Sequence, residues 1–254
     1  MEQDQSDIEK PDRPPLQPAK PASRPVKQFN ERPTKEEIAA LPLFASLPLD
    51  RIEVIKTPGQ ARDAVRAMKQ ERFVGFDTES QPTFSTEQKS TGPHVFQFAL
   101  RERVYIFQSH LKHTLPFVKG IVESAHIVKI GFGLISDRRP LLRVHGMQLA
   151  TTVDLTKELR SLNYKQALGV KAAVAVVLKH RLRKKKSITI SSWSMPKLRN
   201  DQLLYAADDA FAALQIFRAI GSPYKPSTKA ILRQERAKRE EPIKVPLRKN
   251  RHLI

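Results

Sequence analysis

The chain contains no cysteine among its 254 residues. This absence excludes a disulfide framework, a cysteine-ligated zinc site and a catalytic thiol. Long apolar runs are also missing, because the longest unbroken one, Ala172–Leu178, is far shorter than the ~20 residues that a membrane-spanning helix needs. The opening Met1-Glu2-Gln3-Asp4 has neither the basic start nor the apolar stretch of a secretory signal. We therefore expect a cytoplasmic protein with no segment in a membrane.

Acidic residues are scarce relative to basic ones. The 45 Lys and Arg outnumber the 26 Asp and Glu, which gives a formal net charge of +19. Residues 179–199 contain no acidic residue and include Arg181, Arg183, Lys184, Lys185 and Lys186. Basic side chains set against phosphates release condensed counterions, so this excess predicts a nucleic-acid partner. The alternative is a solvated surface that only keeps the protein in solution.

Composition divides the chain into four parts. Residues 1–33 contain seven of the 19 prolines and few apolar side chains, which predicts a disordered head. Residues 34–49 predict a short helical lead-in, because Thr34 is followed by first-turn acids. Residues 50–221 carry the apolar patterns of a folded domain, and residues 222–254 form a basic, flexible tail. No feature of the head identifies a protein partner.

The folded part alternates between strand and helix patterns. The periodicity predicts strands over 52–56, 72–77, 95–100, 104–107, 127–130 and 152–155. It predicts helices over 58–70, 114–124, 136–144, 165–180 and 200–220. Strands that first follow one another and then alternate with helices indicate an α/β fold with a mixed sheet flanked by helices.

Two acids stand at the end of the predicted strand 72–77. Asp77 and Glu79 are two residues apart, so in extended chain both side chains point to one face. Adjacent carboxylates repel each other unless a cation neutralises them, and hard oxygen donors suit Mg²⁺ or Mn²⁺. The alternative is a polar strand end that runs into a loop.

A third acid, Asp137, follows the strand 127–130 and a glycine turn. The turn is not a dinucleotide-binding fingerprint, because Ser136 stands where the third glycine belongs. Asp137 therefore has two interpretations: a functional carboxylate, or a first-turn acid that interacts with the helix dipole.

A fourth acid lies in the predicted helix 200–220. Tyr205 and Asp209 are four residues apart and share one face of that helix. Asp208 and Asp209 stand together among leucine, alanine and phenylalanine, and a core helix does not bury two carboxylates without partners. This pattern favours a functional site. Asp208 points away from Asp209 and is at most a supporting residue.

These segments resemble the tyrosine-bearing branch of the DEDD 3′–5′ exonuclease superfamily, which includes ribonuclease D and the exonuclease domain of the Werner syndrome helicase. The resemblance covers about residues 50–220 and rests on three motifs. These are Phe76-Asp77-Thr78-Glu79, Lys129-Ile130-Gly131 through Asp137, and Tyr205-Ala206-Ala207-Asp208-Asp209-Ala210. It implies a ribonuclease H-like fold. The sequence departs from the family at Ser191-Ser192-Trp193, where the acid of the family's usual Ser-Asp-Trp is missing.

The resemblance also implies a site and a mechanism. In such a site Asp77, Glu79 and Asp209 hold one divalent ion, Asp77 bridges to a second, and Asp137 holds that second ion. The ions would be Mg²⁺ or Mn²⁺, and Tyr205 would orient the attacking water. The implied activity is 3′–5′ hydrolysis of RNA or single-stranded DNA.

For substrate contacts the prediction names Phe84, which could stack on a terminal base, and the basic run. The basic run consists of Arg181, Arg183, Lys184, Lys185 and Lys186. Trp193 is expected to pack in the core, and Asp154 to cap a helix rather than bind metal. Two other functions stay open. One is a catalytically silent adaptor that binds nucleic acid, and the other is a nuclease specialised for short oligonucleotides.

Overall fold

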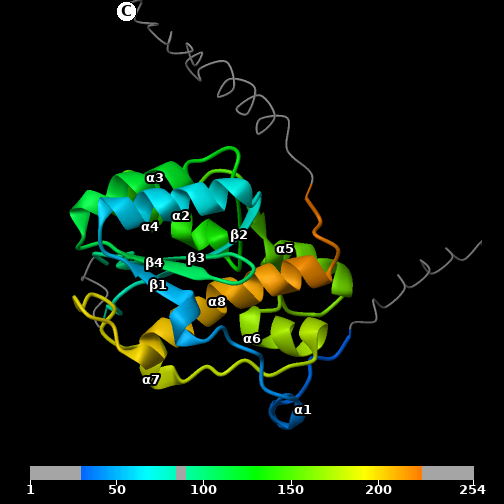
Figure 1. Ribbon diagram of the computed structural model, residues 1–254. Helices are drawn as coiled ribbons and strands as arrows, with labels where there is room; N and C mark the ends of the chain where they lie inside the picture. Colours follow the sequence, from blue (N-terminus) through cyan, green and yellow to red (C-terminus); the bar gives the residue numbers. More distant parts are fainter. Residues whose placement is uncertain (1–29, 84–89, 225–254) are drawn as a thin grey trace, which may run out of the picture.

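The structure is a computed structural model that describes residues 30–83 and 90–224 (Figure 1). Most of the predicted head, most of the basic tail and Phe84 lie outside the described residues. No helix in the described ranges combines the length and apolar character needed to cross a membrane.

A six-stranded sheet forms the centre of the fold, in the order β1-β4-β3-β2-β5-β6. Strands β2, β3 and β4 form an antiparallel meander, whereas the pairs β1–β4, β2–β5 and β5–β6 are parallel. The predicted mixed sheet is therefore confirmed. The strands are β1 Ile52–Ile55, β2 Phe73–Glu79, β3 Val95–Ala99, β4 Val104–Gln108, β5 Val128–Gly131 and β6 Thr152–Asp154.

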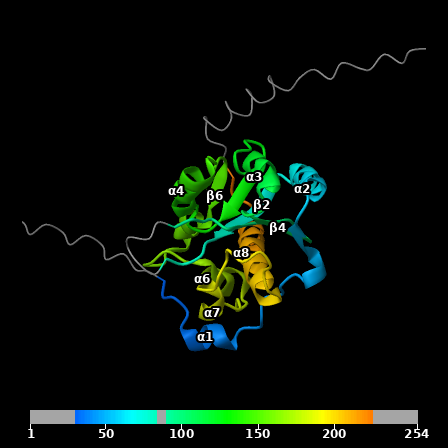
Figure 2. The ribbon, with the colours of Figure 1, turned by 90° about the vertical axis from the view of Figure 1, so that its left-hand side faces the viewer.

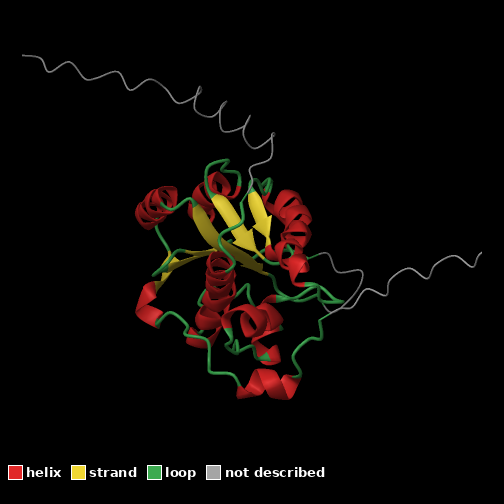
Figure 3. Ribbon diagram, turned by 90° about the vertical axis from the view of Figure 1, so that its right-hand side faces the viewer, coloured by secondary structure: helices red, strands yellow, loops and turns green. Residues whose placement is uncertain are grey.

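Helices cover both faces of this sheet (Figures 2 and 3). The helices α2, α3 and α4 contribute buried side chains to the core on one face, and α8 lies against the other face. The short helices α6 and α7 lie on the α8 side (Figure 1). The helices are α1 Lys35–Ala40, α2 Pro58–Gln70, α3 Leu115–Val122, α4 Leu134–His145, α5 Leu155–Glu158, α6 Val170–Ala173, α7 Lys186–Thr189 and α8 Asn200–Ala219.

Alternation along the central strands sorts their side chains between the two layers. In β2, Val74 and Phe76 enter the core beneath α2–α4. Their neighbours therefore face α8, and this includes Asp77 and Glu79. In β3 the residue opposite Asp77 is Gln97, which by the same alternation also faces α8. The pleat of the sheet thus directs polar groups into the layer between β2, β3 and α8.

Gly75 allows α8 to lie directly on β2. A Cβ placed at this residue would come within 2.0 Å of the Ala210 carbonyl oxygen and 3.1 Å of the Ala99 Cβ. Backbone atoms cannot yield as a flexible side chain can, so the absence of a side chain at Gly75 sets the separation of the strand and the helix.

The predicted helix over 165–180 is wrong. Only α6 is α-helical there, and a π-helical turn over Val174–Leu178 follows it. The turn ends at Lys179, whose backbone is left-handed with φ 56°. The run contains three valines, and β-branched side chains lose rotamer freedom in a helix, which weakens a regular α-helix here. The segment nevertheless buries Val174 and Ala175 in the core.

The lead-in begins as predicted and then extends. The Thr34 side chain accepts a hydrogen bond from the Glu37 backbone, and Glu37 reciprocates to close a capping box on α1. After α1 the chain becomes extended and pairs with the basic run. The Phe44 N–H donates to the Arg181 carbonyl at 3.0 Å, and the Arg181 N–H donates to the Pro42 carbonyl at 2.8 Å.

The contact at Gly75 leads to a first prediction. Gly75→Ala should lower the free energy of unfolding by about 3 kcal/mol, because overpacking of a core against backbone is costly. Urea denaturation followed by circular dichroism measures the effect. Gly120→Ala is the matched control, since open space surrounds that glycine inside α3. It should stabilise the protein slightly. An equal change in the free energy of unfolding for Gly75→Ala and Gly120→Ala would contradict this account of the β2–α8 contact.

Candidate active site

Three carboxylates meet where β2 passes beneath α8. Strand β2 continues to Glu79, two residues beyond its predicted end, so Asp77 and Glu79 both project toward α8. Asp209 comes from the buried middle of that helix. Single oxygen atoms of these three side chains all lie within 4.8 Å of one another. The structure therefore brings together three of the four predicted acids as one cluster, named here the acidic cluster.

The fourth predicted acid, Asp137, lies beside this cluster. Gly133 has a left-handed backbone with φ 63°, and it turns the chain from β5 into the first turn of α4, where Asp137 stands. The Thr78 hydroxyl donates to Asp137 Oδ1 at 2.6 Å. The charge of Asp137 contributes to the raised pKa of both Asp77 and Glu79. Asp137 is thus both a first-turn acid and a neighbour of the cluster.

Burial and mutual repulsion hold protons on the cluster. Burial raises the pKa of Asp77 well above its usual value, and the charges of Asp209, Glu79 and Asp137 raise it further. Burial likewise raises the pKa of Glu79 to about 8, aided by the charge of Asp209. The pKa of Asp137 rises to about 6 through burial. Such a set of hard oxygen donors can hold divalent cations once it loses these protons.

Lys184 is the cation that the structure places in the cluster. Its Nζ lies 2.7 Å from Asp209 Oδ2, and the Asp209 side chain is only 3% exposed. Burial disfavours the charged lysine, but the attraction of Asp209 and the hydrogen bond to it outweigh burial and raise the Lys184 pKa. Asp209 Oδ1 has no hydrogen-bond partner among the described residues. One lysine therefore neutralises only part of this buried charge.

The sequence analysis predicts Lys184 as a nucleic-acid contact and misses its place in the cluster. The available signal was the alternation of a short extended segment. Leu182 is buried and Lys184 is partly buried, whereas Arg181, Arg183 and Lys185 are exposed. Period-two burial in this segment sends the middle lysine inward.

Tyr205 lies one turn before Asp209 and is held by its surroundings. Its hydroxyl lies 2.9 Å from Thr189 Oγ1, and its ring lies 5.8 Å from the Trp193 ring. The Lys184 Nζ stands 4.9 Å from the ring centroid. Burial and then the Asp209 charge raise the Tyr205 pKa. Trp193 is fully buried, which confirms its predicted packing role.

The other basic residues of the predicted contact set lie apart from the cluster. Arg181 joins the lead-in, because its Nε donates to the Leu41 carbonyl at 3.0 Å. Arg183 and Lys185 line a neighbouring pocket. Lys186 is exposed at the first residue of α7.

Two more polar residues support this region. Asp154 accepts from the Thr156 and Gly133 backbone N–H groups, both at 3.0 Å. It therefore caps α5, as predicted, and also fixes the turn that precedes α4. Gln97 is fully buried opposite Asp77, and neither its Oε1 nor its Nε2 has a partner among the described residues. The sequence analysis misses Gln97, although a glutamine between two phenylalanines in Val95–Ala99 was a signal.

Comparison with known families and proteins shows the same kind of domain throughout. Residues 52–223 match the profile of a family described as 3′–5′ exonuclease. A mouse protein named bifunctional 3′–5′ exonuclease/ATP-dependent helicase WRN is 33% identical over 153 residues. That alignment covers 59% of this chain but only 11% of the mouse protein.

Solved structures share the fold. The EXO domain of Aedes aegypti Nibbler has a TM-score of 0.59 and 18% identity, and the match covers 74% of this chain and 92% of that one. A Trypanosoma brucei RNase D complex with RNA U12 has a TM-score of 0.59 and 16% identity, over 68% of this chain and 63% of that one.

The raised pKa of Glu79 predicts how stability without divalent ions depends on pH. A carboxyl whose folded pKa is about 8 rather than 4.5 binds a proton on folding, so its contribution falls as pH rises between these values. In chelator, wild type should lose stability relative to Glu79→Gln by up to about 1.4 kcal/mol per pH unit. Urea denaturation at pH 5 to 8 measures the difference.

The comparison with Glu79→Gln is needed because other groups titrate in the same range. Burial lowers the pKa of Lys129 to about 7, which makes its own contribution rise with pH. Lys129 is common to both proteins, so its effect cancels. Parallel stability profiles for the two proteins would show that Glu79 is not protonated in the folded state.

The Lys184–Asp209 pair leads to a separate prediction. Lys184→Met should lower the free energy of unfolding in chelator by about 1–3 kcal/mol, because a buried acceptor of a charged hydrogen bond loses its donor. Saturating Mn²⁺ should shrink this loss. Lys185→Met, at the next and exposed residue, should change stability little in either buffer. A loss for Lys184→Met that is the same with and without Mn²⁺ would contradict competition between lysine and metal for Asp209.

Proposed function

Because the chain belongs to the 3′–5′ exonuclease family, we propose that it hydrolyses RNA or single-stranded DNA from the 3′ end with the aid of two divalent metal ions. One observation carries the proposal: acids from β2, α4 and α8 converge beside the buried phenol of Tyr205. Burying carboxylates together lowers stability, so their presence together indicates that they serve a function. The convergence also opposes the adaptor alternative, since a protein that only binds phosphates gains nothing from carboxylates.

The donor set fits divalent metal ions. Asp77, Glu79 and Asp209 would hold one ion, and Asp137 with Asp77 would hold the second. When bound, Mg²⁺ or Mn²⁺ ions supply an activated water and neutralise the charge that develops at the phosphate. The raised pKa values mean that ion binding must displace protons from the cluster, so binding should strengthen as pH rises toward 8.

Lys184 and Tyr205 then have distinct tasks. Lys184 would compete with a metal ion for the negative charge of Asp209, and an ammonium displaced from Oδ2 remains close enough to approach a phosphate oxygen. The raised pKa of Tyr205 keeps its hydroxyl protonated near neutral pH, so it does not act as the base. Its hydroxyl instead orients a water by hydrogen bonding, with Thr189 holding the phenol in place.

The substrate is a nucleic-acid strand with a free 3′ end. The formal net charge of +19 supports binding to a polyanion. The mouse relative is named as an exonuclease and helicase, and one structural neighbour was solved with RNA. The chain spans about a tenth of that mouse relative, so its preference between RNA and DNA is part of the proposal.

The experiment is a cleavage assay on matched RNA and DNA strands labelled at the 5′ end, with Mg²⁺, Mn²⁺ or chelator. Wild type should produce a ladder that shortens from the 3′ end only when the divalent ion is present. Asp77→Asn should reduce the rate at least about a hundredfold, since it removes charge that holds the ions. Tyr205→Phe should lower kcat with little change in KM.

Asp63→Asn is the matched control, because Asp63 is exposed on α2 and, within the described part of the chain, forms its ion pair with Arg66. It should leave the rate unchanged. Binding of the strand without shortening under either ion would contradict the proposed hydrolysis and support the adaptor.

A further inference from the structure

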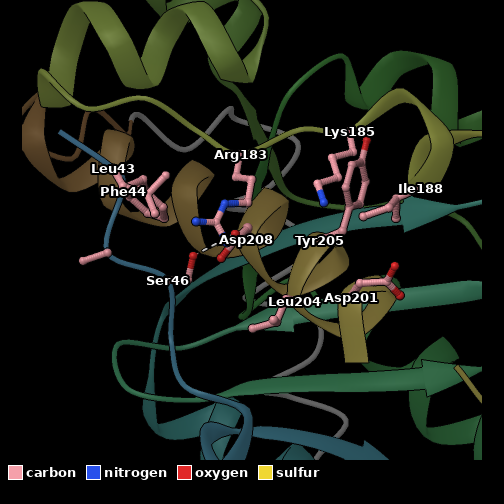
Figure 4. Close-up of a pocket in the computed structure, with 11 residues that line it drawn as sticks. Leu43, Phe44, Ser46, Arg183, Lys185, Ile188, Asp201, Leu204, Tyr205 and Asp208 are labelled. Carbon is pink, nitrogen blue, oxygen red and sulfur yellow. Dashed lines mark hydrogen bonds between the residues drawn. The ribbon is translucent and has the colours of Figure 1, made fainter. Parts of the chain in front are cut away.

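A pocket of about 480 Å³ lies next to the acidic cluster and is not part of it (Figure 4). Its walls come from three separate segments: the extended lead-in after α1, the basic run before α7, and the first half of α8. The lead-in residues Leu43 and Ser46 precede the part of the chain that matches the exonuclease family, which begins at residue 52. This pocket is therefore built partly by residues outside the family-matched part of the chain.

The pocket and the acidic cluster share a wall. Tyr205 lines the pocket. The Lys184 ammonium that contacts Asp209 also lies against the Tyr205 ring. Arg183 and Lys185 line the pocket on either side of Lys184. A strand whose 3′ end lies in the cluster therefore has this pocket as a neighbour within a few nucleotides.

One acid that lines the pocket, Asp208, can accept a further hydrogen bond. Asp208 is only 6% exposed, and its Oδ2 accepts from the Ser46 hydroxyl at 2.9 Å. Figure 4 shows this bond, with Arg183 beside the carboxylate. Among the described residues no ion pair joins Arg183 to Asp208, and no residue donates to Asp208 Oδ1. Asp208 can thus accept one more hydrogen bond, and Arg183 can donate several.

The remaining lining indicates the kind of ligand. The apolar side chains Leu43, Ile188 and Leu204 form part of the wall. The basic Arg183 and Lys185 share the lining with the buried Asp208, whereas the exposed Asp201 at the rim pairs with Arg199. A pocket with apolar walls and a buried carboxylate suits a flat ring with hydrogen-bond donors at its edge better than it suits a phosphate, which the carboxylate repels.

We propose that this pocket binds a nucleobase of the substrate strand, a few nucleotides upstream of the bond that is cut. The apolar walls contact the faces of the base, and Asp208 accepts a hydrogen bond from an exocyclic amino group, as adenine, cytosine and guanine can donate and uracil and thymine cannot. Arg183 and Lys185 bind the adjoining phosphates. The inference rests on the proposed function, because it takes the strand as substrate.

The test removes one base at a time from a labelled single strand. Strands carrying one abasic residue at the second, third, fourth or tenth position from the 3′ end keep every phosphate and lose one base. For wild type, one of the three near positions should raise KM about tenfold, whereas the tenth should not. Leu204→Trp fills the pocket, so it should raise KM for the intact strand to the level of the abasic strand. The position-specific difference in KM should then disappear.

A second variant tests the proposed hydrogen bond. At the sensitive position, wild type should bind cytosine several-fold more tightly than uracil, and Asp208→Asn should reduce that preference. Leu142→Trp is the matched control for bulk, because Leu142 is 53% exposed on α4. It should keep the full abasic penalty. A circular dichroism spectrum and a urea midpoint close to those of wild type would show that Leu204→Trp folds.

The outcomes separate the two proposals. Equal KM for all abasic strands in wild type, or an abasic penalty that persists in Leu204→Trp, would overturn the nucleobase pocket while cleavage itself continues. Fluorescence anisotropy in chelator measures the same series without cleavage. A position-specific loss of binding there, with no shortening under Mg²⁺ or Mn²⁺, would support the pocket and contradict the proposed hydrolysis.

Discussion

The direct contact of α8 with β2 is the constraint on which the rest of this structure depends. Because Gly75 has no side chain, the helix lies with the Ala210 carbonyl against the strand. Two residues further along β2 and one residue earlier in α8 stand Asp77 and Asp209, so the same contact that packs the core brings these carboxylates together. A wider separation would relieve their repulsion and would also dissolve the cluster.

That proximity creates an electrostatic conflict that the protein resolves only in part. Burial and repulsion favour protonated acids, and Lys184 offsets one carboxylate. Gln97 adds an amide in the same layer, opposite Asp77, that has no hydrogen-bond partner in the described part of the chain. The region thus keeps buried polar atoms without hydrogen-bond partners among the described residues, next to a tightly packed core. Such an arrangement is common where a site must bind charged ligands.

The sequence predicted those features of the fold and site that depend on local periodicity. Spacing by two put Asp77 and Glu79 on one face of a strand, and spacing by four put Tyr205 and Asp209 on one face of a helix. The mixed sheet followed from the order of elements. Alternation with Leu182 could have turned Lys184 inward, but its pairing with Asp209 could not be predicted, because that pairing depends on where a distant segment crosses α8. The prediction of a regular helix failed over 174–178 for a different reason, because apolar periodicity does not distinguish an α-helix from a π-helical turn.

The pairing between the lead-in and Arg181 has a consequence for how the unit is delimited. The lead-in is bound to the basic run by backbone hydrogen bonds on both sides of Leu43, and its Phe44 ring packs 5.9 Å from that of Phe211. A fragment trimmed to the family-matched limits would expose apolar surface along α8 and leave the basic run without its neighbouring strand. The residues ahead of the family-matched segment thus hold in position the segment that carries Lys184, so a change in them would reach the acidic cluster without altering any of its carboxylates.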